Sequence, residues 1–396
     1  MASQTICAHA ALRRFLSKIR RHSVDLVAPL SDTDASAQSM PDASPAKWHL
    51  AHTTWFFETF VLAPHVPGYS VFDPAYGFLF NSYYEAAGPR LRRDRRGMLT
   101  RPALAEILAW RAHVDAALDR AIDDLPDSAR TLITLGCHHE QQHQELLLTD
   151  ILHLFSENPF APVYAEDAPF PALNADAHDW LAHPGGIVSI GHAGDSFAFD
   201  CETPRHPELL QPFALGSRLV TNAEWAAFID DGGYRMPTLW LSDGWAWAEQ
   251  NDVTAPLYWR REDGGWSTMT LAGRQAVDPA APATHVSYFE ADAFARWAGA
   301  RLPREAEWEA MAENAALSQL FGTCWQWTQS AYAAYPGFRP AAGAVGEYNG
   351  KFMCGQFILR GSSCATPEGH ARPTYRNFFY PHQRWQFTGV RLAKDI

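Results

Sequence analysis

Residues 131–155 read TLITLGCHHEQQHQELLLTDILHLF, and this run decides the fold of the first part of the chain. It contains no proline, and its apolar residues recur at helical spacing, which predicts a helix with one face in a core. On that helix His139 and His143 are four residues apart and share a face. Gln142 lies beside them, whereas Glu145 points roughly 120° away from His139.

Two imidazoles one helical turn apart are a common half-site for a divalent metal. Histidine pairs also occur on solvated helix faces, so the pair alone leaves both interpretations open. Further ligands would have to come from another part of the chain.

The composition is that of a globular protein and argues against nucleic acid as a partner. The 396 residues are 47% hydrophobic and 19% charged, and the chain is long enough for two domains. Its net charge is −12, and its one dense basic run is RLRRDRRG at residues 90–97. Such a chain is a poor match for nucleic acid. No apolar run reaches the length of a membrane span, so we expect no membrane partner.

The cysteines predict a cytoplasmic protein. The six of them form no C-x-x-C pair, and no secretory apolar segment is present, which indicates free thiols in a reducing compartment. The start of the chain is basic and amphipathic and could be mistaken for a transit peptide. A first bundle helix is the simpler interpretation.

Four helices are predicted in the first part of the chain, over residues 8–27, from 45 onward, about 102–123, and 131–155. Ser44 is the expected N-cap of the second helix, with Pro45 at its first helical position. In the second helix Trp48, His52 and Trp55 form one stripe, with His49 adjacent. A lone histidine on an apolar face is usually a core residue, but bundles build metal sites from facing helices.

A long loop separates the second and third helices. Residues 72–97 read FDPAYGFLFNSYYEAAGPRLRRDRRG, and loops of this length inside a compact domain are usually functional. The loop could be solvated, with its tyrosines packed on the bundle. It could equally be a lid that brings a phenol and a carboxylate-binding arginine to a metal.

After a linker rich in proline, alanine and aspartate the pattern changes to short strands with many glycines. Twelve of the fifteen tryptophans follow residue 170, and two clear helices are predicted over residues 221–231 and 287–300. We therefore expect an α+β protein of two domains. A helical bundle with the metal site would cover residues 1–160, a linker 161–179 and the second domain 180–396.

The second domain resembles the formylglycine-generating-enzyme/sulfatase-modifying-factor domain, a variant of the C-type-lectin fold. Six motifs occur in the order of that family, among them PGGIVSIG at 184, RLPREAEWE at 301 and FTGVRLA at 387. Formylglycine-generating enzymes hold copper with two cysteines near the C-terminus. Cys364 stands in the corresponding segment, but no second cysteine follows it, which counts against that activity.

The first part resembles DinB-like four-helix metal-binding bundles, and the whole chain resembles the EgtB-type sulfoxide synthases of ergothioneine biosynthesis. Their signature H-x-x-x-H-x-E is matched by His139, His143 and Glu145. It is completed by a histidine of an L-A-H segment, which here selects His52 over His49. The resemblance implies a three-histidine Fe(II) site.

That family uses Fe(II) and O2 to join the sulfur of cysteine or γ-glutamylcysteine to C2 of the imidazole of hercynine, leaving a sulfoxide. Three neutral imidazoles leave the metal its full charge and open positions for anions and O2. Gln142, beside the ligands, is placed to bind the substrate imidazole. Small-molecule substrates are thus the expected partners.

Further substrate-binding residues are implied by resemblance alone. Tyr348 in EYNGKF resembles a hercynine-contacting tyrosine, and RNFFYP contributes Asn377, Phe378 and Phe379, whose rings suit a quaternary ammonium.

The better-known subgroup has a tyrosine where this chain has Val345 and an aspartate where it has Phe379. These departures place the chain with the subgroup that carries an adjacent Tyr-Tyr pair. Tyr83 and Tyr84 are therefore the expected proton donor and positioning phenol, in either order.

Phe379 lacks a counter-charge for the extra amino group of γ-glutamylcysteine and so favours cysteine as the sulfur donor. Arg90 or Arg93 would hold the cysteine carboxylate. The sequence leaves open γ-glutamylcysteine, a selenium donor, and histidine with a different regiochemistry. An alternative of another class is a non-catalytic metal- or ligand-binding module, since lectin-like folds often only bind ligands.

Overall fold

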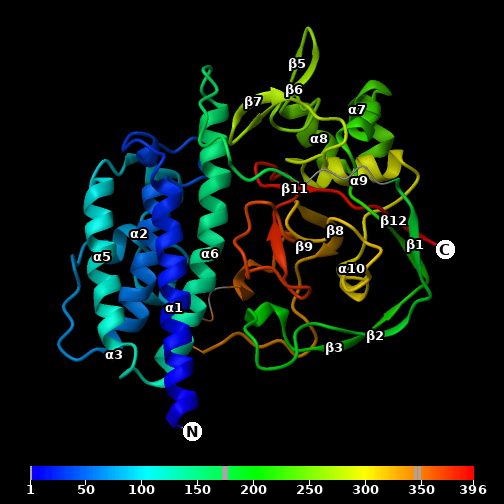
Figure 1. The fold of residues 1–396 in the computed structure, drawn as a ribbon. Coiled ribbons are helices and arrows are strands. Elements are labelled where there is room, and N and C mark those ends of the chain that lie inside the picture. Colours follow the sequence, from blue (N-terminus) through cyan, green and yellow to red (C-terminus); the bar gives the residue numbers. More distant parts are fainter. Residues whose placement is uncertain (1, 172–176, 343–345, 347–348) are drawn as a thin grey trace. The chain divides into compact units, whose positions relative to one another are not determined.

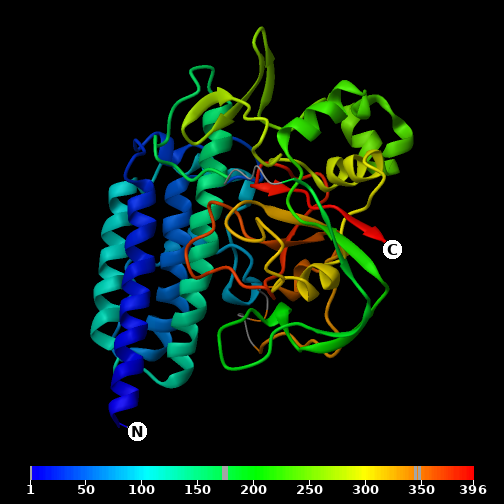
Figure 2. The same cartoon turned by 45° about the vertical axis from the view of Figure 1, so that its right-hand side comes forward.

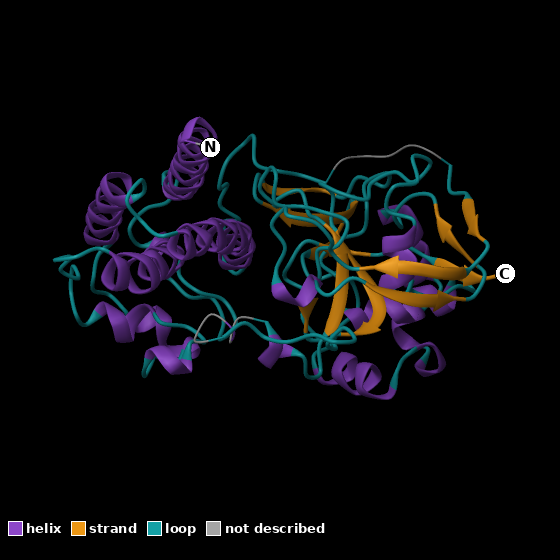
Figure 3. Ribbon diagram, turned by 90° about the horizontal axis from the view of Figure 1, so that it is seen from below, coloured by secondary structure: helices purple, strands orange, loops and turns teal. Residues whose placement is uncertain are grey.

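A computed structural model describes residues 2–171, 177–342, 346 and 349–396. The chain divides into two compact units, one of residues up to 165 and one formed mainly by residues 166–342 and 349–396. Helices make up the first unit, and the strands belong to the second (Figure 3). The α+β class with two domains is thereby confirmed. No helix among the described residues has both the length and the apolar character of a membrane span.

The first unit is a four-helix bundle with short additional helices in its connections. Its four long helices lie side by side (Figures 1 and 2). They are α1 (Ala2–Val27), α2 (Ala46–Phe57), α5 (Leu104–Ala121) and α6 (Asp127–Ser156), with α3 (Ala63–His65) and α4 (Tyr76–Phe80) in the connection after α2.

Helix α2 is the central element of the bundle. It contacts α5 and α6, and all twelve of its residues are buried. A helix buried on every side places any polar residue it carries next to another protein group. Both histidines of α2 are therefore held by neighbours.

The expected N-cap of α2 was wrong. The cap position is Pro45, which supplies no side-chain hydrogen bond. The hydroxyl of Ser44 instead accepts a hydrogen bond from Arg96 Nη1 at 2.9 Å, and the Ser44 backbone N–H donates to Asp150 Oδ2 at 2.8 Å. Ser44 is buried between these two partners, so its hydroxyl contacts Arg96 and does not cap the helix as an N-cap serine would.

The 72–97 loop is ordered by its own polar side chains. Asn81 Nδ2 donates to the carbonyls of Tyr84 and Gly88, both at 3.0 Å, which closes the turn that carries the tyrosine pair. Arg96, buried, reaches from the end of the loop to Ser44 and Ser82. The loop is thus fixed to the start of α2.

Among its described residues, the second unit contains small sheets and four α-helices. Its sheets have the orders β1-β4-β12, β10-β9-β8-β11, β2-β3 and β5-β6-β7, and all neighbours are antiparallel except β8 and β11. The strands are β1 (Trp180–His183), β2 (Gly186–Ile190), β3 (His206–Leu210), β4 (Phe213–Gly216), β5 (Trp259–Glu262), β6 (Gly265–Thr270), β7 (Gly273–Ala276), β8 (Trp325–Ala331), β9 (Phe357–Gly361), β10 (Asn377–Phe379), β11 (Thr388–Gly389) and β12 (Ala393–Asp395).

Two of its helices match the sequence predictions, and two were missed. Helices α7 (Asn222–Asp230) and α9 (Tyr288–Trp297) begin with capping boxes of Thr or Ser and Glu, a strong local signal. The missed helices are α8 (Ser242–Gln250) and α10 (Glu305–Ala310), which lack a side-chain hydrogen bond at the N-cap.

The tryptophan-rich composition is explained by the core of the second unit. Trp308 and Trp327 are fully buried, and their indole N–H groups donate to Gln326 Oε1 at 2.7 Å and to the Val286 carbonyl at 2.9 Å. At these two positions large rings fill the core while their indole donors are satisfied.

Candidate metal centre

Three histidines from two helices converge in the bundle. His52 of α2 and His139 and His143 of α6 each offer a nitrogen, and these nitrogens lie within 4.8 Å of one another. The ring centroids are 4.7 to 5.0 Å apart. The structure thus brings together the three histidines that were predicted as ligands. His49 is not a member of this cluster.

His52 is held in one orientation. Its ring is stacked on Trp48, with centroids 4.7 Å apart, and on Trp55, with centroids 5.5 Å apart. Its Nδ1 lies 2.6 Å from the carbonyl oxygen of Phe80. Because a carbonyl only accepts, Nδ1 carries the proton and Nε2 keeps its lone pair. A metal would therefore bind at Nε2.

The cluster is neutral at physiological pH. Burial lowers the pKa of His52 and of His143 well below the usual value, and the neighbouring His139 lowers both further. Burial also lowers the pKa of His139, to about 3. Neutral imidazole is the form that binds metal, and nitrogen donors of this kind suit iron, zinc, copper or nickel. The residues present therefore fit a divalent transition metal.

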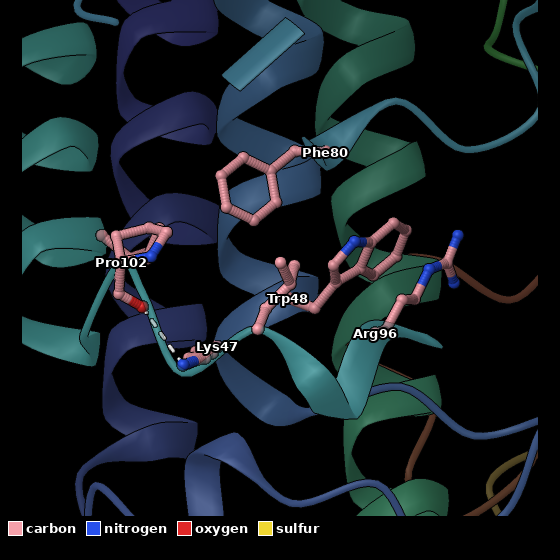
Figure 4. A pocket seen from close by; sticks show the side chains of 7 residues that line it. Lys47, Trp48, Phe80, Arg96 and Pro102 are labelled. Carbon is pink, nitrogen blue, oxygen red and sulfur yellow. Dashed lines mark hydrogen bonds between the residues drawn. The ribbon is translucent and has the colours of Figure 1, made fainter. Parts of the chain in front are cut away.

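A hollow lies beside Trp48, lined by Lys47, Trp48, Phe80, Arg96, Leu99, Pro102 and Ile107. The guanidinium of Arg96 lies 3.3 Å from the centre of the Trp48 ring, and Lys47 Nζ donates to the Pro102 carbonyl at 3.1 Å (Figure 4). Both cations that line the hollow are thus engaged by the protein, which makes this wall a support for Trp48 and, through it, for His52.

Comparisons with known proteins cover nearly the whole chain. Residues 16–147 match the DinB superfamily, and residues 167–319 and 311–396 match the sulfatase-modifying factor enzyme 1-like domain. The hercynine oxygenase of Mycolicibacterium thermoresistibile is 33% identical over 100% of this chain and 97% of its own length.

The chain belongs to the hercynine oxygenase family.

Other relatives agree with this assignment. The hercynine oxygenase of Mycobacterium tuberculosis is 31% identical over 96% of this chain and 98% of its own length. The formylglycine-generating enzyme of Streptomyces coelicolor is 37% identical, but over 36% of this chain and 48% of its own length. The similarity to the latter is thus confined to a part of each protein, whereas the similarity to hercynine oxygenases extends from end to end.

In this member of the hercynine oxygenase family, the two tyrosines of the predicted pair have different surroundings. Tyr84 is buried, and its ring packs on Trp55, at 5.4 Å between centroids, and on Phe60, at 5.2 Å. Tyr83 is half-buried, and its hydroxyl accepts a hydrogen bond from Arg93 Nη1 at 3.0 Å. Trp55 also stacks on His52, so Tyr84 is one ring removed from the cluster.

The two candidate arginines have different partners. Arg93 also donates through Nη2 to the Asp42 carbonyl, which fixes it beside Tyr83. Arg90 forms an ion pair with Glu85 at 2.8 Å, an exposed carboxylate of the same loop. A carboxylate ligand would have to displace Glu85 from Arg90, whereas Arg93 holds no carboxylate among the described residues.

Gln142 is half-buried on α6, next to His143 in sequence. In the second unit Phe378 is stacked on Tyr332, at 4.2 Å between centroids, and lies 5.9 Å from Phe352. Phe379 is half-buried on β10 next to it, and the Asn377 side-chain oxygen accepts from the Phe378 backbone N–H at 2.9 Å. Tyr348, predicted to contact substrate, lies outside the described residues.

Sequence reasoning missed Tyr332 and Asp150. Tyr332 forms the aromatic stack with Phe378; it ends the family motif FGTCWQWTQSAY at 321, but the motif assigned it no role. Asp150 accepts from His49 Nε2 at 3.0 Å, and it lies seven residues after His143, two helical turns on the same face. That spacing was a usable signal, because an acidic residue two turns from a ligand histidine faces the same neighbouring helix.

Proposed function

We propose that this protein is an iron(II)-dependent oxygenase that joins the sulfur of cysteine to C2 of the hercynine imidazole and leaves a sulfoxide. The observation that carries the proposal is the cluster of His52 and His139, both buried, with the half-buried His143. It occurs in a chain that is similar from end to end to hercynine oxygenases.

The reaction balances with O2 as the sole oxidant. Hercynine loses the hydrogen on C2, the thiol loses its hydrogen, and a carbon–sulfur bond forms with the removal of two electrons. Oxidation of sulfur to the sulfoxide removes two more. O2 accepts all four, one oxygen atom enters the sulfoxide and the other leaves as water with the two hydrogens.

The neutral cluster suits this chemistry. Bound Fe(II) would supply the redox reaction with O2 and would lower the pKa of a bound thiol. Because His52, His139 and His143 contribute no negative charge, the site would favour an anionic thiolate. Gln142, adjacent to His143, is proposed to orient the substrate imidazole by hydrogen bonding.

The 72–97 loop is proposed to supply the proton and the carboxylate clamp. Tyr83 and Tyr84 are the proposed proton donor and positioning phenol. The hydrogen bond from Arg93 to Tyr83 supports Arg93 over Arg90 as the residue that holds the cysteine carboxylate, because Arg90 is already paired with Glu85.

The second unit is proposed to bind the quaternary ammonium of hercynine. The stacked rings of Phe378 and Tyr332, with Phe379 and Asn377 on the same strand end, supply aromatic faces and an amide. Tyr348 is proposed as a further contact on the basis of resemblance. Phe379 supplies no carboxylate for the amino group of γ-glutamylcysteine, which supports plain cysteine.

The test is product formation with a defined metal and a defined thiol. Protein loaded with Fe(II) under argon is given hercynine, O2 and either cysteine or γ-glutamylcysteine, and products are followed by mass spectrometry, with zinc-loaded protein as the control. We expect hercynylcysteine sulfoxide with iron and cysteine. Product from γ-glutamylcysteine alone would overturn the donor. No sulfoxide with either thiol despite bound iron would overturn the hercynine assignment.

A further inference from the structure

His143 belongs to a hydrogen-bonded network of three side chains. His143 Nδ1 is 2.9 Å from His49 Nδ1, and His49 Nε2 is 3.0 Å from Asp150 Oδ2. His49 is three residues before His52 on α2, and Asp150 is seven residues after His143 on α6. The same two helices that carry the cluster therefore also carry the groups behind it.

The side chains of His49 and Asp150 are enclosed in the bundle. His49 is 4% exposed and Asp150 is 5% exposed, so water does not compete freely for their hydrogen bonds. Asp150 Oδ2 also accepts from the Ser44 backbone N–H at 2.8 Å. A carboxylate oxygen that is held from two directions fixes the position of the histidine that donates to it.

When His143 binds a metal, one arrangement of protons satisfies every hydrogen bond of this network. The metal needs the lone pair of His143 Nε2, because Nδ1 faces His49; Nδ1 must then carry the proton and donate it. His49 Nδ1 is the acceptor and must be unprotonated, which leaves the His49 proton on Nε2. That N–H donates to Asp150, which only accepts.

We propose that His49 and Asp150 are positioning residues that hold His143 in the tautomer with a free Nε2 and orient its ring toward the metal. The inference rests on the proposed metal centre. Ligand histidines commonly donate their second N–H to a carboxylate or carbonyl, and loss of that partner weakens metal binding by about 10- to 100-fold. His52 uses the Phe80 carbonyl directly, whereas His143 reaches its carboxylate through a second histidine.

The test compares Co(II) affinity, measured by visible absorption titration of the apo-protein, between the wild type and four variants. His49→Phe removes the acceptor for His143, and Asp150→Asn keeps the shape but removes the charge. His49→Asn is the rescue variant, since its side-chain oxygen can replace Nδ1 as an acceptor. His153→Gln is the matched control: His153 also lies on α6, and its Nδ1 forms a hydrogen bond with Ser39 rather than with His143, His49 or Asp150.

We expect His49→Phe to weaken Co(II) binding by about 10- to 100-fold, with partial recovery in His49→Asn and no change in His153→Gln. Asp150→Asn should also weaken binding. The tautomer is read independently from the imidazole nitrogen shifts of ¹⁵N-histidine-labelled apo-protein. His143 should be protonated at Nδ1 in the wild type and lose that preference in His49→Phe.

The two proposals fail differently. Wild-type protein that binds Co(II), with His49→Phe and Asp150→Asn binding it equally well and the His143 tautomer unchanged, would overturn the positioning role alone. Wild-type protein that binds no Co(II) would overturn the metal centre and this inference with it. A loss of affinity with a wild-type tautomer would indicate a structural defect and would also overturn it.

Discussion

Replacement of Glu140 by glutamine is expected to destabilise the bundle strongly. Glu140 is next to His139 on α6 and is 1% exposed. Its carboxylate accepts from Arg20 Nη1 of α1 at 3.0 Å and from Arg111 of α5. One carboxylate thus contacts two buried cations and joins three of the four long helices. Glu140→Gln leaves Arg111 without its paired carboxylate and leaves Arg20 with Asp115 alone, at 2.6 Å.

The magnitude follows from breaking a buried ion pair. Removing one partner costs about 3–5 kcal/mol, because an uncompensated charge stays buried. The lowered pKa of Glu140 gives a similar figure. Burial raises the pKa of Glu140, but the guanidiniums of Arg111 and Arg20 more than offset this, and the pKa falls from 4.5 to about 2. That depression corresponds to about 3 kcal/mol.

The sign of the pH dependence follows from the lowered pKa. A carboxyl whose pKa is lower in the folded state stabilises the protein above its unfolded pKa of 4.5, and this stability is lost as the pH falls toward about 2. Glu140→Gln should therefore remove part of the acid sensitivity of the bundle between these values. The variant and the wild type should converge in stability as the pH approaches the lower value.

The assay is thermal unfolding at pH 7 followed by circular dichroism. A loss of 3–5 kcal/mol lowers the Tm of a domain of this size by roughly 6–20 °C. Asp119→Asn is the matched control, because Asp119 pairs with Arg13 between α5 and α1 but is 69% exposed, and we expect a change of about 1 kcal/mol or less. A Glu140→Gln protein with the Tm of the control would refute the reasoning.

Three further predictions concern the loop and the second unit. Of Tyr83→Phe and Tyr84→Phe, one should lower kcat by about 100-fold or more with little change in KM; wild-type kcat in both would exclude the pair as proton donors. Arg93→Met should raise the KM for cysteine by roughly 10- to 100-fold, and a larger effect of Arg90→Met would reverse their proposed roles. Glu305→Gln, which removes the carboxylate bound by Arg360 and Arg376, should lower the thermal stability of the second unit and leave Co(II) affinity unchanged, which affinity measurements on the purified variant would check.

The sequence was most informative where a pattern is local. Helix periodicity predicted α6 and the shared face of His139 and His143. The helices predicted over residues 221–231 and 287–300 are α7 and α9, and the structure shows that both begin with capping boxes. The choice of His52 over His49 came from a resemblance, because both histidines lie on a helix that is buried on every side. No periodicity distinguishes two faces when both are covered.

Long-range partners were the part that the sequence did not reveal. The contact of His49 with Asp150 depends on how α2 and α6 are aligned, and the use of Ser44 as an acceptor for Arg96 depends on the path of the 72–97 loop. Both are set by packing between segments far apart in the chain. Polar residues in such places can be recognised as buried only after the helices are assembled.

The most direct test of the three-histidine centre is iron stoichiometry. Protein reconstituted with Fe(II) under argon and freed of loose metal should hold one iron per chain, and His52→Ala, His139→Ala and His143→Ala should each hold almost none while remaining folded. Full iron content in any of the three variants would contradict the assignment of that histidine as a ligand, and full content in all three would place the metal elsewhere.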